Sequence, residues 1–308
     1  ILVISPWNFP CAIPVGGIVA GLAGGNTVIL KPATVAAPVA WMFAKAFWDA
    51  GVPKEALQVI ITRREALKVL TTAPAIKHII LTGGTDTAQN IAKANPTTPL
   101  SAETGGKNVI ILTASGDRDH AIMNIVTSAF GNAGQKCSAC SLLLVERSVY
   151  EDENFRSKLK DAATSLKTGS VWNAGNIVGP MITNKNDKLL QAFNLEPGES
   201  WLVPPRFIDR REYILAPTVK WGVKPESFSF RTELFGPMLS VACIDNLQQG
   251  IELVNSLDYG LTSGLQSLDE NEQKLWKDSI LAGNLYINRG ITGAIVNRQP
   301  FGGMKLSA

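Results

Sequence analysis

Short apolar runs alternate with segments of helical hydrophobic spacing along most of this chain. In the first third, the apolar runs are Leu2–Ser5, Thr27–Lys31, Gln58–Ile61 and His78–Thr82, and Ala37–Ala50 carries apolar residues at helical spacing. Parallel strands cannot be joined by tight hairpins and need a crossover connection, usually a helix. The alternation therefore predicts βαβ units and an α/β fold on largely parallel sheets.

The alternation continues to the end of the chain, with an interruption at the pair Gly105-Gly106. We predict one domain over residues 1–105 and a second over residues 106–308, and a length of 308 residues suits two domains. Residues 168–235 are rich in Pro, Gly and Trp, so we expect mostly loop there. The further predicted helices are Arg64–Thr72, Asp86–Asn95, Asp119–Phe130, Asp152–Leu166, Leu247–Ser256 and Glu270–Ala282. The further predicted strands are Asn108–Leu112, Ser141–Val145, Ala216–Lys220, Leu239–Ile244 and Asn284–Asn288.

Composition and charge exclude several classes of protein. Hydrophobic residues make up 45% of the chain and charged residues 18%, which is typical of a globular protein and not of a disordered one. The net charge of +3 is too small and too dispersed to favour binding to nucleic acid. Four cysteines in this length do not make a disulfide scaffold, so we predict a reducing compartment, the cytoplasm.

The segment from residue 1 to residue 30 contains no charged side chain, which raises the alternative of a membrane span. However, Pro6, Pro10 and Pro14 would break a helix repeatedly, and no basic segment precedes the apolar stretch. We therefore predict no transmembrane segment, and instead buried strands joined by a Gly/Pro-rich loop and a short helix. Because the chain opens inside a strand pattern at Ile1 and stops at Ala308, we expect a longer parent protein, truncated here at both ends.

Cys137 is the candidate nucleophile among the cysteines. It lies in the polar, glycine-bearing segment Gly134–Ala139, and the adjacent Lys136 favours the thiolate, which is the form that attacks electrophiles. Cys11 and Cys243 lie in apolar runs, so we expect buried, unreactive thiols at both positions.

Cys140 turns this segment into a C-x-x-C motif, so zinc binding and dithiol redox chemistry are alternatives. A structural zinc site needs four ligands, and His78 and His120 lie in or beside strand and helix patterns. A thioredoxin-like motif should open a helix, whereas this one precedes the predicted strand Ser141–Val145. We therefore favour a nucleophilic cysteine and predict no metal site.

Two polar residues are candidates for acting with such a nucleophile. No histidine is suitably placed as a base. Glu103 is a candidate base because it lies at the glycine-lined break Glu103–Lys107, and the alternative is that Glu103 is an ordinary surface carboxylate. Asn8 is held between Pro6 and Pro10 in an uncharged segment, so its amide either ties down the loop or donates to an oxyanion.

Two further segments are placed where an α/β sheet binds ligands. Lys31 lies at the end of a predicted strand, and ligands bind outside the carboxyl ends of such strands. The segment Leu81–Thr85 runs from a strand into a helix and could present backbone N–H groups to a pyrophosphate, although it lacks the full G-x-G-x-x-G pattern.

Taken together, seven ordered motifs resemble the aldehyde dehydrogenase superfamily over essentially the whole chain. They are Pro6–Pro10, Lys31–Ala33, Thr82–Thr85, Glu103–Lys107, Gly134–Cys137, Glu233–Pro237 and Pro300–Gly303. Within the superfamily, Gln135–Ser138, Gly283–Ala294 and Glu196–Trp201 are similar to the L-glutamate γ-semialdehyde (Δ1-pyrroline-5-carboxylate) dehydrogenases, which include the second half of bifunctional proline utilisation A. The resemblance implies a Rossmann-type cofactor domain in residues 1–105 and an α/β catalytic domain in residues 106–308, both on parallel sheets.

The resemblance also implies a reaction, the oxidation of L-glutamate γ-semialdehyde to L-glutamate in proline catabolism. Cys137 would attack the aldehyde to give a thiohemiacetal, whose oxyanion the Asn8 amide and the Cys137 backbone N–H would hold. Hydride would pass to NAD, and Glu103 would activate the water that hydrolyses the thioester. The implied cofactor-binding residues are Trp7, Lys31, Thr34, Gly83, Gly84, Glu233 and Phe235.

A substrate anchor loop over residues 290–301 is implied as well. The backbone N–H groups of Gly293 and Ala294, with Ser138, would anchor the substrate α-carboxylate, because small residues let backbone donors approach it closely. Phe9 and Phe301 would clasp the aliphatic chain of the substrate.

Departures from the family pattern leave alternatives open. Thr34 stands where many NAD-using relatives carry a carboxylate, so NADP remains an alternative cofactor, and Gly84 and Ala88 replace a frequent Ser and Gly. Relatives have more sequence before Pro6 and a flap and tail that make the oligomer. We expect the longer parent to be a homo-oligomer. A proline dehydrogenase module in the same polypeptide is an alternative to a monofunctional parent. Another aldehyde substrate, an inactive fragment and a cofactor-independent cysteine hydrolase are the functional alternatives.

Overall fold

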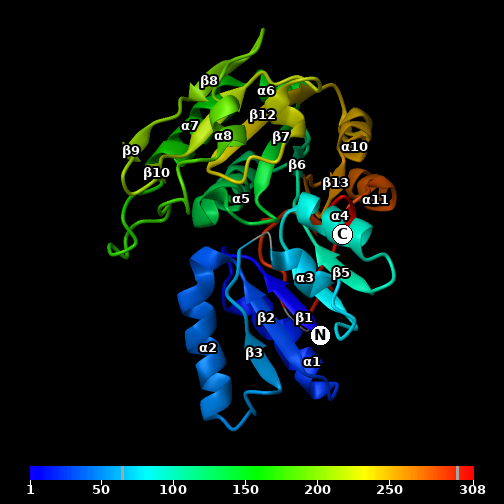
Figure 1. The fold of residues 1–308 in the computed structure, drawn as a ribbon. Coiled ribbons are helices and arrows are strands. Elements are labelled where there is room, and N and C mark those ends of the chain that lie inside the picture. The colour runs from blue at the N-terminus through cyan, green and yellow to red at the C-terminus, as the bar shows by residue number, and fades with distance from the viewer. Residues whose placement is uncertain (64–65, 296–297) are drawn as a thin grey trace. The chain divides into compact units, whose positions relative to one another are not determined.

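The computed structural model describes residues 1–63, 66–295 and 298–308 of the chain. These residues form two compact units (Figure 1). The first unit comprises Ile1–Gly105 together with Ser307–Ala308, and the second comprises Gly106–Leu306. Each unit contains its own parallel sheet, so the predicted α/β fold class is confirmed.

Ser307 and Ala308 belong to the first unit, and not to the region 106–308 in which the sequence analysis included them. Hydrogen bonds explain the difference: the backbone N–H of Thr104 donates to the Ser307 carbonyl at 2.9 Å, and Ser307 Oγ donates to the Gly105 carbonyl at 2.8 Å. The chain therefore ends against the segment that leaves the first sheet.

The first unit is a doubly wound sheet whose strands have the order β3-β2-β1-β4-β5 and are all parallel. Its strands are β1 (Leu2–Ser5), β2 (Val28–Pro32), β3 (Leu57–Val59), β4 (Ile79–Thr82) and β5 (Leu100–Glu103). Its helices are α1 (Ala12–Ala23), α2 (Ala37–Asp49), α3 (Leu67–Thr71) and α4 (Thr85–Ala94). Arg64, with which the predicted helix Arg64–Thr72 begins, lies outside the described residues.

Two apolar clusters cover the two faces of this sheet. Because side chains alternate along a strand, Leu2 and Ile4 of β1 pack in one cluster and Val3 packs in the other. The charge-free residues 1–30 therefore form the buried strand β1, the loop to α1, α1 itself and most of β2, as predicted for buried strands joined by a loop and a short helix. Pro14 is tolerated there because it lies in the first turn of α1, where its missing N–H costs no hydrogen bond within the helix.

The second unit is built on a larger sheet with the strand order β15-β14-β6-β7-β12-β11-β8. Its neighbouring strands are parallel apart from β8, which pairs antiparallel with β11. The strands of this sheet are β6 (Asn108–Leu112), β7 (Cys140–Glu146), β8 (Ser200–Val203), β11 (Thr218–Trp221), β12 (Met238–Ile244), β14 (Thr262–Gln266) and β15 (Asn284–Ile287). The helices are α5 (Arg118–Phe130), α6 (Arg147–Tyr150), α7 (Glu153–Ser165), α8 (Asp187–Gln191), α9 (Phe228–Arg231), α10 (Leu247–Asn255) and α11 (Glu270–Ser279). Two small pairs, β9 (Phe207–Asp209) with β10 (Ile214–Leu215) and β13 (Tyr259–Gly260) with β16 (Met304–Lys305), complete the unit.

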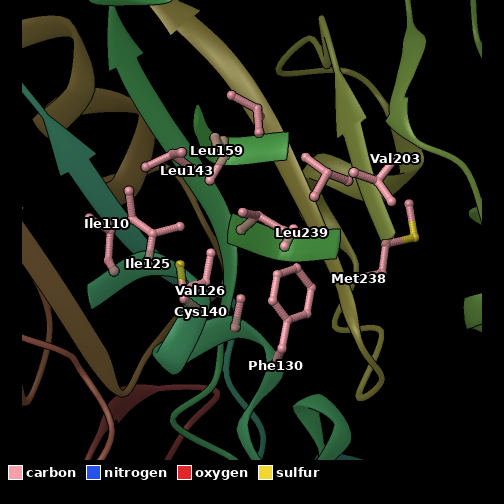
Figure 2. Packing of buried hydrophobic residues seen from close by; sticks show 14 of the residues in the cluster. Ile110, Ile125, Val126, Phe130, Cys140, Leu143, Leu159, Val203, Met238 and Leu239 are labelled. Atoms are coloured by element: carbon pink, nitrogen blue, oxygen red, sulfur yellow. The ribbon is translucent and has the colours of Figure 1, made fainter. Parts of the chain in front are cut away.

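Helix α5, which covers the whole of the predicted helix Asp119–Phe130, packs against this sheet through buried apolar residues. Ile125, Val126 and Phe130 lie in one buried cluster with residues of β6 and β7, as Figure 2 shows. Cys140 contributes its side chain to the same cluster, so the buried thiol of this unit is Cys140 and not Cys243.

Several elements differ from the sequence-based expectation. Strands β5, β8 and β14 were not predicted. Residues 168–235 are mostly loop, as expected, although they also contain the short helices α8 and α9 and the strands β8, β9 and β10 in addition to β11. The sequence of β14 is Thr-Ser-Gly-Leu-Gln, which is too polar to signal a strand, although all five residues are buried. Cys11 is exposed because it lies just before the first turn of α1, and Cys243 is half-buried near the end of β12, so the expectation of two buried thiols is wrong.

Within the described ranges, no helix combines the length and apolar character needed to cross a membrane.

Candidate active site

The carboxyl ends of the strands in the first unit gather most of its candidate residues. Since the strands are parallel, the segments after β1, β2, β4 and β5 leave the sheet at the same edge. Strand β1 lies between β2 and β4, so the chain winds away from β1 in both directions and leaves a topological switch point there. Open α/β sheets bind ligands at such a point.

Asn8 lies in the loop between β1 and α1. The Phe9 carbonyl accepts from the backbone N–H of Ile13 at 3.3 Å, so this loop leads directly into the first turn of α1. Trp7, Asn8 and Phe9 are all half-buried. The Ala33 N–H donates to the Ser5 carbonyl at 2.9 Å and thereby joins the segment after β2 to the end of β1.

Lys31 and Thr34 lie at the end of β2 and just beyond it. Lys31 is half-buried within the strand, whereas Thr34 is exposed at the start of a short 3₁₀ helix, Thr34–Ala36. Thr34 thus places an uncharged side chain at this edge of the sheet.

Gly83 and Gly84 connect β4 to α4, as the strand-to-helix pattern predicts. Gly84 is the residue that precedes the first turn of α4, in an extended conformation, and a Cβ there would meet no atom within 4 Å. The Gly83 N–H donates to the Glu103 carbonyl at 3.0 Å, which ties this turn to the end of β5. A helix N-terminus approached through two glycines is favourable for an anionic group such as a phosphate.

Glu103 is the last residue of β5 and is half-buried. Burial raises the pKa of its carboxyl from 4.5 to about 7. One carboxyl oxygen, Oε2, is fully buried and has no hydrogen-bond partner among the described residues. A carboxyl with a pKa near neutrality can accept a proton from water at physiological pH.

Cys137 follows a tight turn at the end of α5. Asn132, Ala133 and Gly134 have φ values of 57°, 53° and 67°, so three successive residues adopt the left-handed conformation. A Cβ on Gly134 would lie 2.2 Å from the Gly236 carbonyl oxygen, so only glycine fits at this position. The turn thus packs directly on the backbone of the Glu233–Pro237 motif.

The backbone around Cys137 is held by a buried side chain. The Cys137 carbonyl accepts a hydrogen bond from Asn108 Nδ2 at 2.6 Å, and the Ala139 carbonyl accepts one from the same nitrogen at 2.9 Å. Cys137 itself is half-buried, whereas burial raises the pKa of Cys140 to about 12. Of the two thiols in the C-x-x-C motif, Cys137 is therefore the one suited to act as a nucleophile.

Glu233 lies beside this backbone. Its Oε1 accepts a hydrogen bond from the Gly106 N–H at 2.8 Å, and burial raises the pKa of its carboxyl. Lys107 is completely buried next to it, and burial lowers the pKa of its ammonium to about 7, against the opposing attraction of Cys140 and Glu233. Gly106, Lys136, Glu233 and Phe235 are among the residues that line a small pocket here.

The loop 290–301 is attached at several points, and its residues 296 and 297 lie outside the described ranges. The Ile291 N–H donates to the buried Ser128 Oγ of α5 at 3.0 Å, and Gln299 Nε2 donates to the Tyr286 hydroxyl at 3.0 Å. Gly293 has a φ of 111°, which favours glycine, and a Cβ there would meet no atom within 4 Å. Gly293 itself is exposed.

The remaining predicted substrate-binding residues have different environments. Ala294 is half-buried and Phe301 is exposed. Ser138 is buried next to Cys137, and its carbonyl accepts a hydrogen bond from Thr262 Oγ1 at 3.4 Å.

Within the second unit the structure thus brings Cys137, Ser138, Glu233 and Phe235 around the segment Gly106–Asn108. The sequence analysis missed the polar members of that segment, Lys107 and Asn108. A signal was present, because Asn108 is a polar residue directly before the apolar run Val109–Leu112, and a buried amide must be paired. Over the described ranges, no group of three or more His, Cys, Asp or Glu side chains is arranged to hold a metal ion.

Comparison with known proteins identifies the class to which this fold and these motifs belong. Residues 1–308 match the model of the aldehyde dehydrogenase family, so the chain is a member of that family.

Several individual members of the family are similar to this chain over nearly its whole length. The chain is 35% identical to 1-pyrroline-5-carboxylate dehydrogenase of Geobacillus kaustophilus, over 99% of this chain and 61% of the relative. Proline utilization A from Corynebacterium freiburgense is 42% identical, with a TM-score of 0.94 over 99% of this chain and 32% of that protein. The Thermus 1-pyrroline-5-carboxylate dehydrogenase with bound NAD is 34% identical, with a TM-score of 0.93 over 99% of this chain and 61% of that one. The chain therefore spans less than two thirds of the length of these relatives.

Proposed function

We propose that this chain is part of an enzyme that oxidises L-glutamate γ-semialdehyde, formed from Δ1-pyrroline-5-carboxylate, to L-glutamate with NAD. The observation that carries the proposal is similarity over 99% of the chain to relatives named 1-pyrroline-5-carboxylate dehydrogenase and proline utilization A. The half-buried thiol of Cys137, which follows the tight left-handed turn Asn132–Gly134, supports the aldehyde chemistry.

The residues of the first unit fit a dinucleotide cofactor. The sheet has a switch point at β1, and Lys31, Gly83 and Gly84 lie at the carboxyl ends of its neighbouring strands. We assign the adenosine ribose to Lys31 and the pyrophosphate to the start of α4, with Trp7 and Thr34 beside them. Glu233 would bind the nicotinamide ribose, and Phe235 would pack near the ring. Bound NAD would supply the hydride acceptor, and NADP remains an alternative because Thr34 is uncharged.

In the proposed reaction the protein groups have separate roles. Cys137 Sγ forms a bond to the aldehyde carbon and gives a thiohemiacetal. The Asn8 amide and the Cys137 N–H donate to the oxyanion. Loss of hydride to the acceptor that NAD would supply converts the thiohemiacetal to a thioester. Glu103 then takes a proton from the water that hydrolyses the thioester, and its pKa of about 7 suits this task.

We assign recognition of the substrate α-carboxylate to the loop 290–301. The conformation of Gly293, with a φ of 111° and open space around it, supports backbone donation by Gly293 and Ala294, together with the Ser138 side chain. Phe9 and Phe301 would contact the aliphatic part of the substrate.

Steady-state NADH formation from the semialdehyde tests the proposal, both in the protein as its complete reading frame encodes it and in the 308-residue chain. We expect turnover in the complete protein, a loss of at least about 10⁴-fold in kcat for Cys137→Ser, and a change of less than about twofold for the control Cys243→Ser. Absence of turnover in the complete protein would refute the proposal. Turnover there but none in the 308-residue chain would show that this part alone is inactive.

A different aldehyde is the main competing substrate. Gly293→Val should raise KM for the semialdehyde by roughly tenfold or more and leave KM for a simple aliphatic aldehyde within about twofold, because only the semialdehyde carries a carboxylate. An equal effect on both aldehydes would contradict the assignment to glutamate γ-semialdehyde.

The proposed partners and location concern the longer protein. Because the chain is similar to proline utilization A, the longer protein has two alternatives. It is either a monofunctional enzyme or a bifunctional one with a second catalytic module, a proline dehydrogenase. A homo-oligomer and a cytoplasmic location remain predictions from the sequence.

A further inference from the structure

Asn108 is the only polar residue of β6, the strand Asn108–Leu112, and it is 2% exposed. No catalytic or binding role has been assigned to it above. Its side chain nevertheless makes a complete set of interactions, since Nδ2 donates to the carbonyls of Cys137 and Ala139 and Oδ1 accepts from the Thr262 N–H at 3.0 Å. Both amide protons and the amide oxygen are therefore used.

The two bonds from Nδ2 hold the peptide unit before Ser138 and the peptide unit after Ala139. Because a peptide unit is planar, holding the Cys137 carbonyl also sets the direction of the peptide N–H that follows it. The Ser138 carbonyl between them accepts from Thr262 Oγ1, and the Thr262 N–H returns to Asn108 Oδ1. A closed network thus joins β6, β14 and the cysteine segment.

Packing shows that this network has little freedom. A Cβ added to Gly106 would lie 2.6 Å from the Cys137 carbonyl oxygen and 2.8 Å from Asn108 Oδ1. The Gly106 N–H in turn donates to Glu233 Oε1. The Cys137 carbonyl and the Asn108 side chain thus fill the space beside Gly106, and any side chain at position 106 would displace them.

We propose that Asn108 is a positioning residue of the reaction, which holds the Cys137–Ala139 backbone so that the Cys137 thiol keeps its reactive placement. The inference rests on the proposed function for its kinetic part. Reaction rates depend steeply on such placement, and a displacement of about 1 Å can cost on the order of 10²-fold.

Asn284 provides a matched control. It is also a buried asparagine at the start of a strand of the same sheet, with 4% exposure, and its Nδ2 donates to the carbonyls of Leu261 and Gly302. Neither bond reaches the cysteine segment. The Leu261 carbonyl belongs to the peptide unit whose N–H donates to Asn108, so Asn284 contacts that network only through this peptide, and the Gly302 carbonyl follows the loop 290–301. Loss of either asparagine removes the same side-chain amide from the core.

The experiment compares Asn108→Ala with Asn284→Ala in the complete protein. For Asn108→Ala we expect kcat to fall by about 10²-fold while KM for the semialdehyde stays within about threefold. For Asn284→Ala we expect the opposite pattern, in which KM for the semialdehyde rises while kcat stays within about threefold of the wild-type value. Equal losses of kcat in the two variants would overturn the proposal.

Alkylation by iodoacetamide without cofactor gives a readout that does not depend on turnover. Release of the Cys137–Ala139 backbone should expose the half-buried Cys137, so peptide mass spectrometry should find faster labelling of Cys137 in Asn108→Ala, with Cys140 still protected. Labelling of Cys137 and Cys140 together would mean loss of the core and would overturn a positioning role.

Thr262→Val covers the case in which Asn108→Ala does not fold. It removes the hydroxyl bond to the Ser138 carbonyl, keeps the backbone N–H that Asn108 accepts, and preserves side-chain volume. We expect a smaller change in the same direction, several-fold in kcat with KM unchanged, and an unchanged kcat would contradict the proposal. If the wild-type protein itself shows no turnover, the proposed function fails, whereas the alkylation result still decides the role of Asn108.

Discussion

At the scale of single residues, burial changes the proton affinity of the Glu103 carboxyl. Its pKa of about 7 results from desolvation of the carboxylate at the end of β5. If Glu103 is the general base, hydrolysis of the thioester requires its ionised form. We therefore expect kcat to rise with pH through about 7, and Glu103→Gln to abolish this limb while leaving a burst of about one NADH per active site.

Stopped-flow measurement of NADH formation between pH 6 and pH 9 checks this prediction. Glu55→Gln is the control, because Glu55 is an exposed carboxylate of the same unit. A Glu103→Gln variant with normal steady-state turnover would remove Glu103 from the mechanism.

The raised pKa of Glu103 also makes the stability of the folded protein depend on pH. A carboxyl whose pKa is raised by folding binds its proton more tightly in the folded state, so its contribution to stability is lost as pH rises from about 4.5 through about 7. Glu103→Gln should therefore raise the Tm at pH 8 and change it little at pH 4. Thermal unfolding followed by circular dichroism at the two pH values measures the difference, and a lowered Tm at pH 8 would argue against a destabilising carboxylate.

At the scale of elements, α5 connects two parts of the candidate site. Its end leads into the left-handed turn before Cys137, and the buried Ser128 Oγ accepts from the Ile291 N–H at the start of the loop 290–301. A single helix thus sets the position of both the nucleophile segment and the proposed substrate loop.

Gly134→Ala tests the turn. The new methyl group would overlap the Gly236 carbonyl in a backbone conformation that favours glycine, so we expect destabilisation by several kcal/mol, about 3 or more. Gly131→Ala is the matched control, because its φ is negative and a Cβ would meet only Lys136 Nζ at 3.6 Å. Urea unfolding of both variants measures the contrast, and equal midpoints would contradict this account of the turn.

Ser128→Ala tests the attachment of the loop. It leaves the Ile291 N–H without its buried acceptor, which typically costs about 1–3 kcal/mol, and should raise KM for the semialdehyde more than it lowers kcat. Ser229→Ala is the control, since Ser229 Oγ is equally buried and has no hydrogen-bond partner among the described residues. If the two substitutions have equal effects on unfolding and on KM, the Ser128 hydrogen bond does not hold the loop.

At the scale of the whole molecule, the two units have separate hydrophobic cores, so a ligand is expected to stabilise the unit that binds it. NAD at about one hundred times its Kd should add about 2.7 kcal/mol to the stability of the folded protein and raise the Tm. Lys31→Ala should reduce this rise, whereas Lys93→Ala should leave it unchanged because Lys93 is exposed on the opposite end of α4 from Gly84. Calorimetry with and without NAD measures the shifts, and an identical rise in both variants would exclude Lys31 from the cofactor site.

The sequence by itself determined the class of fold and the family. The period of apolar residues distinguishes strand from helix within about ten residues, so β1, β6 and α5 are recognisable from their own segments. The family motifs are equally local, since each occupies a few consecutive positions. Cys137, Glu103 and Asn8 could be singled out for this reason, and their roles stay predictions.

Only the tertiary structure decided which residues support those candidates. Asn108 meets Cys137 across 29 positions of sequence and Thr262 across 154, and Ser128 meets Ile291 across 163. Such partners depend on the order of strands, which places the unpredicted β14 beside β6. Short-range sequence patterns do not determine that order, because it results from the packing of the whole sheet. The same packing places hydrogen-bond donors next to the Cys137 backbone.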